Sequence, residues 1–245
     1  MPGSRGAWIA GNGLLLSALL ILWIGNATNI DIMLADAAFD KVTHSFPMQH
    51  AWLAEKFNHG ILKKALSALA VFVVVLALWD AVRPRRHWPD SRRIGLRVVA
   101  MSAVLVPLVI TLAKQESASH CPWDLQRYGG TAPYIRLLEK MPVDVSPGQC
   151  MPAGHASSAL WLISLAAFWW PHSRRKGVAV GVLMLCAGVA VGWLQQLRGA
   201  HFLTHTLWSA WIACALVMAI YAVVRKGLAR LPEPGYNSVP AATQP

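Results

Sequence analysis

Five polar side chains stand near the ends of apolar segments in the second half of this sequence, and their types suit work on a phosphate ester. They are Lys114, His155, Arg198, His201 and His205. Ionisable groups are costly beside membrane-like apolar segments, so such a set suggests a function. Cations can offset the charge on phosphoryl oxygens, one imidazole can attack phosphorus, and another can protonate the leaving oxygen.

The histidines stand where helices are expected to begin. His155 follows the Pro-Ala-Gly sequence of residues 152–154 and opens an apolar segment, so free backbone N–H groups there favour an anion. His201 and His205 are spaced to share one helix face. Each residue taken singly is more often an anchor or a structural group. Their joint placement at the ends of three segments favours one shared site.

Apolar segments long enough to cross a bilayer must position these residues. Hydrophobic residues form 56% of the chain and charged residues only 13%, which argues against an ordinary soluble domain. A helix needs about 20 apolar residues to span a bilayer, and the runs here are continuous, unlike the alternating strands of a membrane barrel. We therefore predict an all-α fold, a bundle of six transmembrane helices in one membrane-embedded domain over residues 1–230. The predicted spans are residues 7–26, 61–82, 96–113, 155–171, 177–194 and 202–224.

The formal net charge of +11 is unevenly distributed over the predicted loops. With the N-terminus in the cytoplasm, the arginine-rich loop 83–97, the run 174–176 and residues 225–230 all fall on one side. Basic residues gather in short cytoplasmic loops, so this charge indicates topology and not a nucleic-acid partner. We expect both termini in the cytoplasm and the polar cluster on the outer face. The compact size and short loops favour a bacterial inner membrane.

Segments outside the spans complete the expected organisation. Residues 28–60 mix apolar with polar residues and suit one or two amphipathic interfacial helices on the outer face. The outer loop 114–151 is rich in Pro and Gly, so we expect it to be largely irregular, with a short helix at Ala132–Lys140. The polar tail 231–245 is predicted to be disordered. The first apolar run also resembles a signal peptide, but it is long enough to cross a membrane itself.

The four cysteines differ in their expected position relative to the membrane. Cys186 and Cys214 lie within predicted spans, whereas Cys121 and Cys150 both fall in the outer loop. An oxidising compartment would allow the loop pair to form a disulfide, although two cysteines in one loop guarantee no geometry. A disulfide closing about 30 residues would contribute roughly 3–4 kcal/mol in the chain-entropy model. It would also tie residue 121 to the start of the fourth span.

The polar residues and their order resemble the type-2 phosphatidate phosphatase superfamily, which includes membrane lipid phosphatases and soluble vanadium haloperoxidases. Its first two motifs are K-x6-R-P and P-S-G-H. Residues 114–122 read KQESASHCP, which matches the first motif except that Cys121 takes the arginine position. Residues 152–155 read PAGH, which matches the second with Ala153 for serine.

The third motif of that superfamily is S-R-x5-H-x3-D, and residues 194–205 read LQQLRGAHFLTH. His201 takes the histidine position, Gln195 the arginine position and His205 the aspartate position. The resemblance extends over the third to sixth predicted spans, about half of the chain. The motifs are individually weak, and their order and placement in a six-helix frame carry the comparison.

The resemblance implies a two-step reaction that needs no metal and no cofactor. His201 would attack phosphorus and form a phosphohistidine while His155 protonates the departing oxygen, and water would then release phosphate. Lys114 would hold the phosphoryl oxygens, assisted by the N–H groups of Gly154 and His155.

Departures from the motifs call for substitutes. Arg198 lies one helical turn from Gln195 and can supply one of the two missing guanidinium groups. Arg127 or His120 can supply a second ligand for the substrate. A neutral His205 can still accept a hydrogen bond from His201.

A carboxylate is also missing from the motifs, because His205 has no fixed negative charge. We expect Glu116 or Asp124 to provide it as an orienting group. Wild-type phosphatase rates in alanine variants of both residues would contradict this role.

Four functions remain open from the sequence. A lipid phosphatase would act at the outer leaflet on undecaprenyl diphosphate, phosphatidylglycerol phosphate, phosphatidate or the phosphates of lipid A. The same phosphohistidine would make a lipid-to-lipid phosphotransferase if an acceptor lipid replaced water. The loss of motif residues also suits a non-catalytic lipid-binding relative. A zinc hydrolase would use His155, His201 and His205 as ligands, but no Glu follows either later histidine as in H-E-x-x-H.

Overall fold

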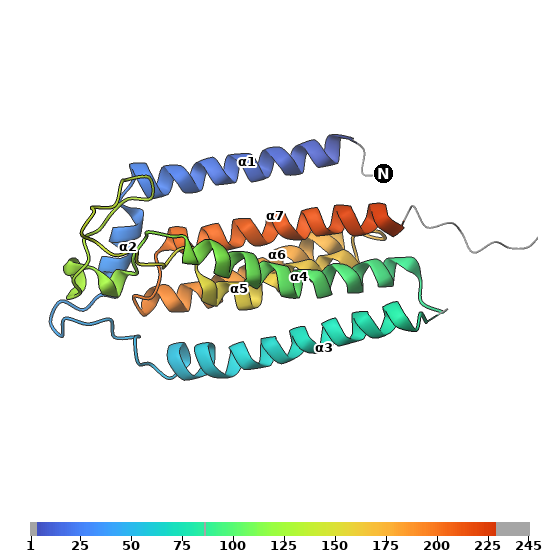
Figure 1. Ribbon diagram of the computed structural model, residues 1–245, viewed down its shortest axis with the longest axis horizontal. Coiled ribbons are helices and arrows are strands. Elements are labelled where there is room, and N and C mark those ends of the chain that lie inside the picture. Colours follow the sequence, from blue (N-terminus) through green and yellow to red (C-terminus); the bar gives the residue numbers. More distant parts are fainter. Residues whose placement is uncertain (1–3, 86, 229–245) are drawn as a thin grey trace, which may run out of the picture.

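The computed structural model describes residues 4–85 and 87–228, and within these ranges the chain forms helices and no strand. The long helices lie side by side along the longest axis of the molecule (Figure 1). The predicted all-α class is confirmed, whereas the predicted tail 231–245 lies outside the described residues. In chain order the elements are α1 (Ser4–Ala27), α2 (Ile30–Ala38), the π-helix η1 (Leu53–Leu62), α3 (Lys63–Val82), α4 (Asp90–Gln115), the short 3-10 helices η2 (Pro122–Asp124) and η3 (Gln126–Tyr128), α5 (Gly154–Leu160), the 3-10 helix η4 (Trp161–Phe168), α6 (Arg174–Leu197) and α7 (Leu203–Leu228).

Five helices of the described chain are long and apolar enough to cross a membrane. They are α1, the continuous helix Leu53–Val82 that joins η1 to α3, α4, α6 and α7. Large apolar side chains on the outer helices are exposed, including Leu16 and Leu20 of α1 and Phe72 and Leu78 of α3. Exposed apolar faces of this extent suit contact with lipid. These features are those of a multi-pass membrane protein.

The fourth predicted span, residues 155–171, is a shorter apolar helix over Gly154–Phe168. It changes from α-helical to 3-10 geometry at Trp161. A 3-10 helix rises about 2.0 Å per residue against about 1.5 Å in an α-helix, which makes this helix about 26 Å long. A bilayer core is about 30 Å thick, so the count of six spans stays a prediction.

The same short helix forms the centre of the bundle. Leu160 and Trp161 at its midpoint are almost completely buried and pack with residues of α4 and α7 such as Val106 and Ala213. On α6, Gly188 lets the two helices approach closely, because a Cβ atom there would lie 2.5 Å from Leu160 Cδ2. The helix that carries His155 is therefore packed against neighbouring helices on several sides.

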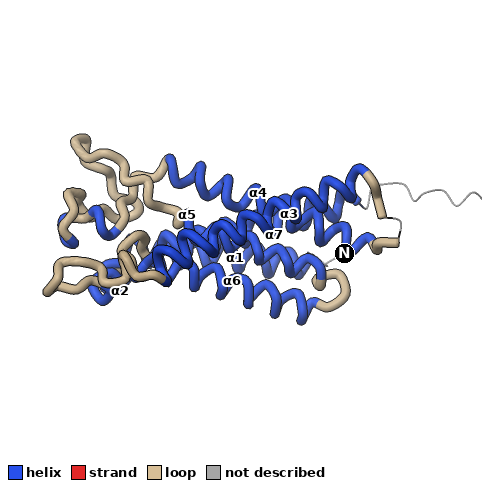
Figure 2. Tube along the Cα trace, turned by 90° about the horizontal axis from the view of Figure 1, so that it is seen from below, coloured by secondary structure: helices blue, strands red, loops and turns tan. Residues whose placement is uncertain are grey.

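The long connections gather at one end of the bundle. Figures 1 and 2 place α2, the segment after it and the loop between α4 and α5 at this end, opposite the start of α1 and the end of α7. The basic segments that follow α3 and precede α6 lie at that opposite end (Figure 1). The fold thus separates a loop-rich end from a basic end, as the charge pattern predicts.

One of two local predictions at the loop-rich end needs correction. Residues 28–60 contain one short separate helix, α2, while the helical stretch that begins at Leu53 continues directly into α3. An interfacial position for α2 stays a prediction. The short helix predicted at Ala132–Lys140 is wrong, because this segment forms a turn around residues 137–138.

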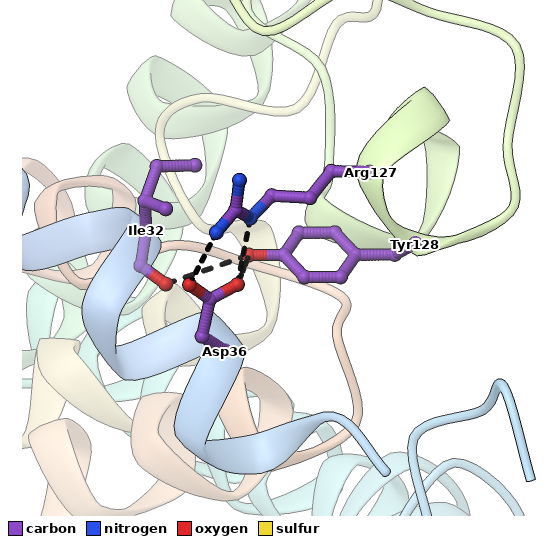
Figure 3. Close-up of polar contacts among 4 residues, drawn as sticks. All are labelled: Ile32, Asp36, Arg127 and Tyr128. Atoms are coloured by element: carbon purple, nitrogen blue, oxygen red, sulfur yellow. Dashed lines mark hydrogen bonds and ion pairs between the residues drawn. The ribbon is translucent and has the colours of Figure 1, made fainter. Parts of the chain in front are cut away.

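Two arginines explain how the outer loops are fastened to the N-terminal helices. Arg136 donates to the backbone oxygens of Asn26 and Thr28 at 3.1 and 2.7 Å, which fixes its segment as a turn against the end of α1. Arg127 binds both carboxylate oxygens of Asp36 on α2 at 2.7 Å (Figure 3). The Tyr128 hydroxyl donates to the same carboxylate at 2.9 Å.

We expect Arg136→Ala to lower the thermal unfolding temperature more than Arg127→Ala. Arg136 is half-buried and its loss leaves backbone carbonyls without a donor, which costs about 1–3 kcal/mol. Arg127 is exposed, and an exposed ion pair contributes about 0–1 kcal/mol. Unfolding of both purified variants in one detergent, followed by circular dichroism, checks this order. Equal losses would contradict the assigned anchor.

Candidate active site

A backbone contact between α5 and α7 brings the histidines together. The N–H of Ala153, just before α5, donates to the His205 carbonyl oxygen at 3.0 Å. The Ser209 hydroxyl reaches the carbonyl oxygens of Ala153 and His205, both at 3.0 Å. His155 is the second residue of α5, and His201 lies just before α7. Segments about 50 positions apart in sequence therefore meet at one point.

His155 and His201 face each other across this junction. Nδ1 of His155 lies 3.4 Å from Nε2 of His201, and the ring centroids are 5.6 Å apart. His201 is buried, with 2% of its surface exposed, whereas His155 is partly exposed. A buried imidazole beside a more accessible one fits the pairing of a nucleophile with a proton donor.

The surroundings of His201 fix which ring nitrogen carries the proton. The ring is hydrogen-bonded to the Cys150 backbone, and since the Cys150 N–H already donates to Ser119, the Cys150 carbonyl must be the acceptor. Nδ1 is the nitrogen on the Cys150 side, at 3.4 Å from Cys150 Sγ. With the proton on Nδ1, Nε2 keeps its lone pair and faces Nδ1 of His155.

Burial and neighbouring cations keep His201 neutral. Its pKa lies well below the usual range, chiefly because burial penalises the imidazolium and further because His205, His155 and Lys114 lie near. A neutral imidazole is the form that can attack phosphorus. The low pKa of His201 is therefore compatible with the nucleophilic role that the motifs predict for it.

His205 has a different partner from the one expected. Its Nε2 lies 3.0 Å from the Ser119 hydroxyl, and its ring centroid is 5.8 Å from that of His201. Its buried Nδ1 has no hydrogen-bond partner within the described part of the chain. The Cys150 carbonyl thus takes the orienting role that the sequence suggested for His205.

Lys114 stands in the last turn of α4, close to the start of α5. A Cβ atom on Gly154 would lie 3.9 Å from Lys114 Cδ, so the lysine side chain packs over the first residue of that helix. Over residues 4–85 and 87–228, the Lys114 ammonium makes no hydrogen bond or ion pair. Its charge is close enough to contribute to the low pKa of His201.

Arg198 and Gln195 are bonded to each other one turn apart. Nη1 of Arg198 donates to Gln195 Oε1 and Nε donates to the Gln49 carbonyl oxygen, both at 3.0 Å. Arg198 is 8% exposed, and none of the ion pairs among described residues includes it. Gln195, which takes the arginine position of the motif, therefore binds the guanidinium of Arg198, three residues further along the chain.

The turn between Arg198 and His201 depends on a glycine. Gly199 has a φ of +74°, and a Cβ atom there would collide with the ring of Phe46. The Gly199 carbonyl also accepts a hydrogen bond from the Trp123 N–H at 3.0 Å. This turn fixes the direction in which the chain reaches His201.

Two further residues expected at the site are occupied elsewhere. Arg127 is bound by Asp36 at the surface (Figure 3), so it does not join the histidines. The Asp124 carboxylate accepts from the Cys121 N–H at 3.3 Å and closes the short turn η2. These contacts give both side chains local structural roles.

The remaining two expected residues, His120 and Glu116, lie in the loop that follows α4. His120 packs against Gly148, where a Cβ atom would lie 2.6 Å from the imidazole Cγ. Glu116 is exposed and lines a groove beside the site. The roles predicted for these two side chains stay predictions.

A disulfide joins Cys121 to Cys150 directly behind His201, with a Cα–Cα distance of 5.3 Å. Backbone hydrogen bonds from residues 148–150 to residues 117–119, of 2.9–3.0 Å, run alongside it. The two sulfurs and His201 lie within 4.8 Å of one another, but disulfide sulfurs are not thiolate ligands for a metal. In the ranges described, the ligand atoms of His155, His201 and His205 form no such group, which weighs against the zinc alternative.

Three contributors to this site were missed by sequence reasoning. They are the Ser119 hydroxyl on His205, the Cys150 carbonyl on His201, and Asp31, which binds the start of α7. Ser119 and Cys150 lie within the loop 114–151, but only the folded loop shows which atoms they present. Asp31 gives no motif signal, because it lies far from the histidines in sequence.

The fold and the site define an all-helical membrane protein with paired histidines near a lysine, Lys114, at one end of its bundle. The sequence model of the PAP2 superfamily matches residues 95–228, and the chain belongs to this superfamily. The matched region runs from the first turns of α4 to the end of α7 and includes every histidine of the site. No curated protein and no solved structure matches the chain.

The disulfide predicts a specific pattern of cysteine alkylation. Unfolded without reductant, the protein should take up alkylating agent at Cys186 and Cys214 only, and at all four cysteines after reduction. In a Cys121→Ser variant, Cys150 should become an additional reactive thiol before reduction. Intact-mass spectrometry counts the labels, and labelling of all four cysteines without reductant would contradict the disulfide.

Proposed function

We propose that this protein is an integral membrane lipid phosphatase that works through a phosphohistidine. The observation that carries the proposal is the pair of His155 and His201, 3.4 Å apart, within a chain of the PAP2 superfamily. Members of that superfamily are generally phosphatases, which supports hydrolysis of phosphoric esters at a coarse level. The substrate and the individual steps are our inference.

In the proposed reaction, His155 begins as an imidazolium and His201 as a neutral imidazole. Nε2 of His201 attacks phosphorus, and the bond from phosphorus to the leaving oxygen breaks as His155 transfers a proton to that oxygen and becomes neutral. His155, now lacking that proton, then removes one from water, which attacks the phosphohistidine and releases phosphate. The Cys150 carbonyl keeps Nδ1 of His201 as a donor throughout.

The charge balance of the site supports an anionic substrate. Lys114 and Arg198 form no ion pair within the described ranges, and Arg198 is buried, with the charge of Glu55 acting on it only from beyond ion-pair distance. Unpaired buried charge is costly, and a phosphate group would offset it. We assign both side chains to the phosphoryl oxygens, with the N–H groups of Gly154 and His155 assisting them.

A groove beside the site supports a lipid substrate. It has a volume of about 480 Å³ and lies between α1, α4 and α7, with Leu22, Ala113 and Ile212 among its apolar walls. Ser119, which binds His205, and Pro152, which precedes α5, also line it. A hydrocarbon chain in this groove would have its phosphate end near the histidines.

The substrate candidates remain undecaprenyl diphosphate, phosphatidylglycerol phosphate, phosphatidate and the phosphates of lipid A. We propose that the basic end faces the cytoplasm of a bacterial inner membrane and that the site faces outward, because short basic loops stay inside. A phosphotransferase differs only in its acceptor, since a lipid hydroxyl would replace water. A non-catalytic lipid-binding relative is the remaining alternative.

We expect His201→Ala to lower kcat at least about 1,000-fold, since it removes the nucleophile, and His155→Ala to lower it about 100–10,000-fold. His172→Ala, at the other end of the bundle, is the matched control and should keep the wild-type rate. The four candidate lipids, labelled with radioactive phosphate, report both free phosphate and any labelled acceptor lipid.

Each outcome of this assay decides between the alternatives. Unchanged turnover by His201→Ala would exclude the phosphohistidine, and loss of wild-type activity in a strong chelator would favour a metal mechanism. Transfer of label to a second lipid would favour the phosphotransferase. Binding of these lipids without turnover by the wild type would favour the non-catalytic relative.

Filling the groove should weaken the use of long-chain substrates alone. Ile212→Trp places a larger ring against the proposed hydrocarbon chain, and we expect KM for a long-chain lipid phosphate to rise about tenfold, or about 1.4 kcal/mol. KM for a phosphate ester with a very short chain should stay within about twofold. Met218→Trp, on the exposed face of α7, controls for added bulk.

Equal effects of Ile212→Trp on short and long substrates would contradict the assigned groove. The same would follow if Met218→Trp raised KM as strongly. Both comparisons use one enzyme preparation, so differences in detergent content cancel.

A further inference from the structure

The start of α7 has an unusual support. The first N–H groups of a helix have no partner within the helix, and a Ser, Thr, Asp or Asn just before it usually accepts one of them. Here Phe202 precedes Leu203, the first residue of α7, and cannot do so. The support comes instead from Asp31, which lies 173 positions away in sequence on α2.

Asp31 binds this turn through both oxygens of its carboxylate. Oδ1 accepts from the Thr204 N–H at 3.0 Å, and Oδ2 accepts from the Thr204 hydroxyl in a short contact. Leu203 contributes a further backbone hydrogen bond. Asp31 is 4% exposed, and among the described ion pairs none includes it, so the N-terminus of α7 is its main electrostatic partner.

The bonded turn is directly connected to the proposed nucleophile. His201 lies two residues before Leu203, and His205 directly follows Thr204. Asp31 and His201 also line one small cavity of about 10 Å³, together with Gln196. Oε1 of Gln196 is buried there with no partner among the described residues.

We propose that Asp31 is a positioning residue that fixes the first turn of α7 and thereby the ring of His201. This inference rests on the proposed function. Asp31 lies outside the region matched by the superfamily, residues 95–228, and in this chain His205 stands where the motif has a carboxylate. The carboxylate of Asp31 on α2 instead binds the backbone and hydroxyl of Thr204, the residue just before His205.

The test compares Asp31→Ala and Asp31→Asn with wild type and with Asp36→Asn. Asp36 is the matched control, because it lies on the same helix and its carboxylate also fastens a loop, but one that holds Arg127 and Tyr128. Displacing a reacting group by about 1 Å can cost about 100-fold in rate. We expect kcat of Asp31→Ala to fall about 30–100-fold with KM within about threefold of wild type.

Asp31→Asn should recover part of that loss, to within about tenfold of wild type, because its amide oxygen still accepts from one of the two Thr204 donors. Asp36→Asn should stay within about twofold. The amount of trapped phosphoenzyme, measured with labelled substrate before one turnover, should fall in parallel with kcat. A general loss of folded protein would instead lower the monodisperse fraction in size-exclusion chromatography in detergent.

Wild-type kcat in Asp31→Ala, an equal fall in Asp36→Asn, or a loss expressed only in KM would overturn the positioning role. If Asp31→Ala does not fold, the isosteric Asp31→Asn alone decides, by a kcat reduced at least about threefold with unchanged KM. Wild type and His201→Ala are run beside these variants. An inactive wild type would refute the proposed phosphatase. An active wild type together with wild-type kcat in both Asp31 variants would refute only this inference.

Discussion

The hydrogen bond from the Ala153 N–H to the His205 carbonyl is the contact on which the proposed site depends. It fixes the height of α5 relative to α7, and Ser209 holds both ends of it. A shift of α5 by one residue would move His155 by about 1.5 Å along the axis and by about 100° around it. His155 and His201 would then no longer meet. The Gly188 contact with Leu160 keeps α5 from moving away from α6 and so supports the same register.

Around this contact, the outer loops supply polar partners that an apolar bundle lacks. Buried polar groups require hydrogen bonds, and at this end they come from the loop between α4 and α5 and from α2. The Cys150 carbonyl serves His201, the Ser119 hydroxyl serves His205, and the carboxylate of Asp31 serves the start of α7. The disulfide and the backbone bonds beside it fix Ser119 and Cys150 relative to each other. The loop is therefore part of the site and not merely a connection.

The sequence predicted the structure best where the signal was a long apolar run or a motif with fixed spacing. Long apolar runs reveal helices because each residue in the run must be tolerated by lipid, and five of the expected spans appear as long apolar helices. Motif spacing also revealed the superfamily, because His155, His201 and Lys114 keep their order although several motif positions differ. These signals are local or follow a fixed spacing.

The same reasoning failed where one distant contact decides the structure. The turn at residues 137–138 follows from the hold of Arg136 on the end of α1, and nothing near Arg136 in sequence shows that its partner is there. Arg127 was offered, as an alternative to His120, for a missing motif arginine, and its bidentate contact with Asp36 depends on how α2 meets the loop, which the sequence does not show (Figure 3). The length of the helix Gly154–Phe168 also depends on its change to 3-10 geometry at Trp161, which its composition does not show.

The departures from the motifs together describe a site with a different charge balance. A carboxylate on the nucleophilic imidazole would stabilise its cationic form, but here a neutral carbonyl accepts from His201. The nucleophile then gains no compensation for positive charge from the protein, and burial and Lys114 disfavour that charge further. In the proposed mechanism, the phosphohistidine would therefore obtain its compensation from the phosphoryl group, whose oxygens we assign to Lys114 and Arg198. Of the two motif arginine positions, Cys121 takes one and forms a disulfide, and Gln195 takes the other and binds the guanidinium of Arg198.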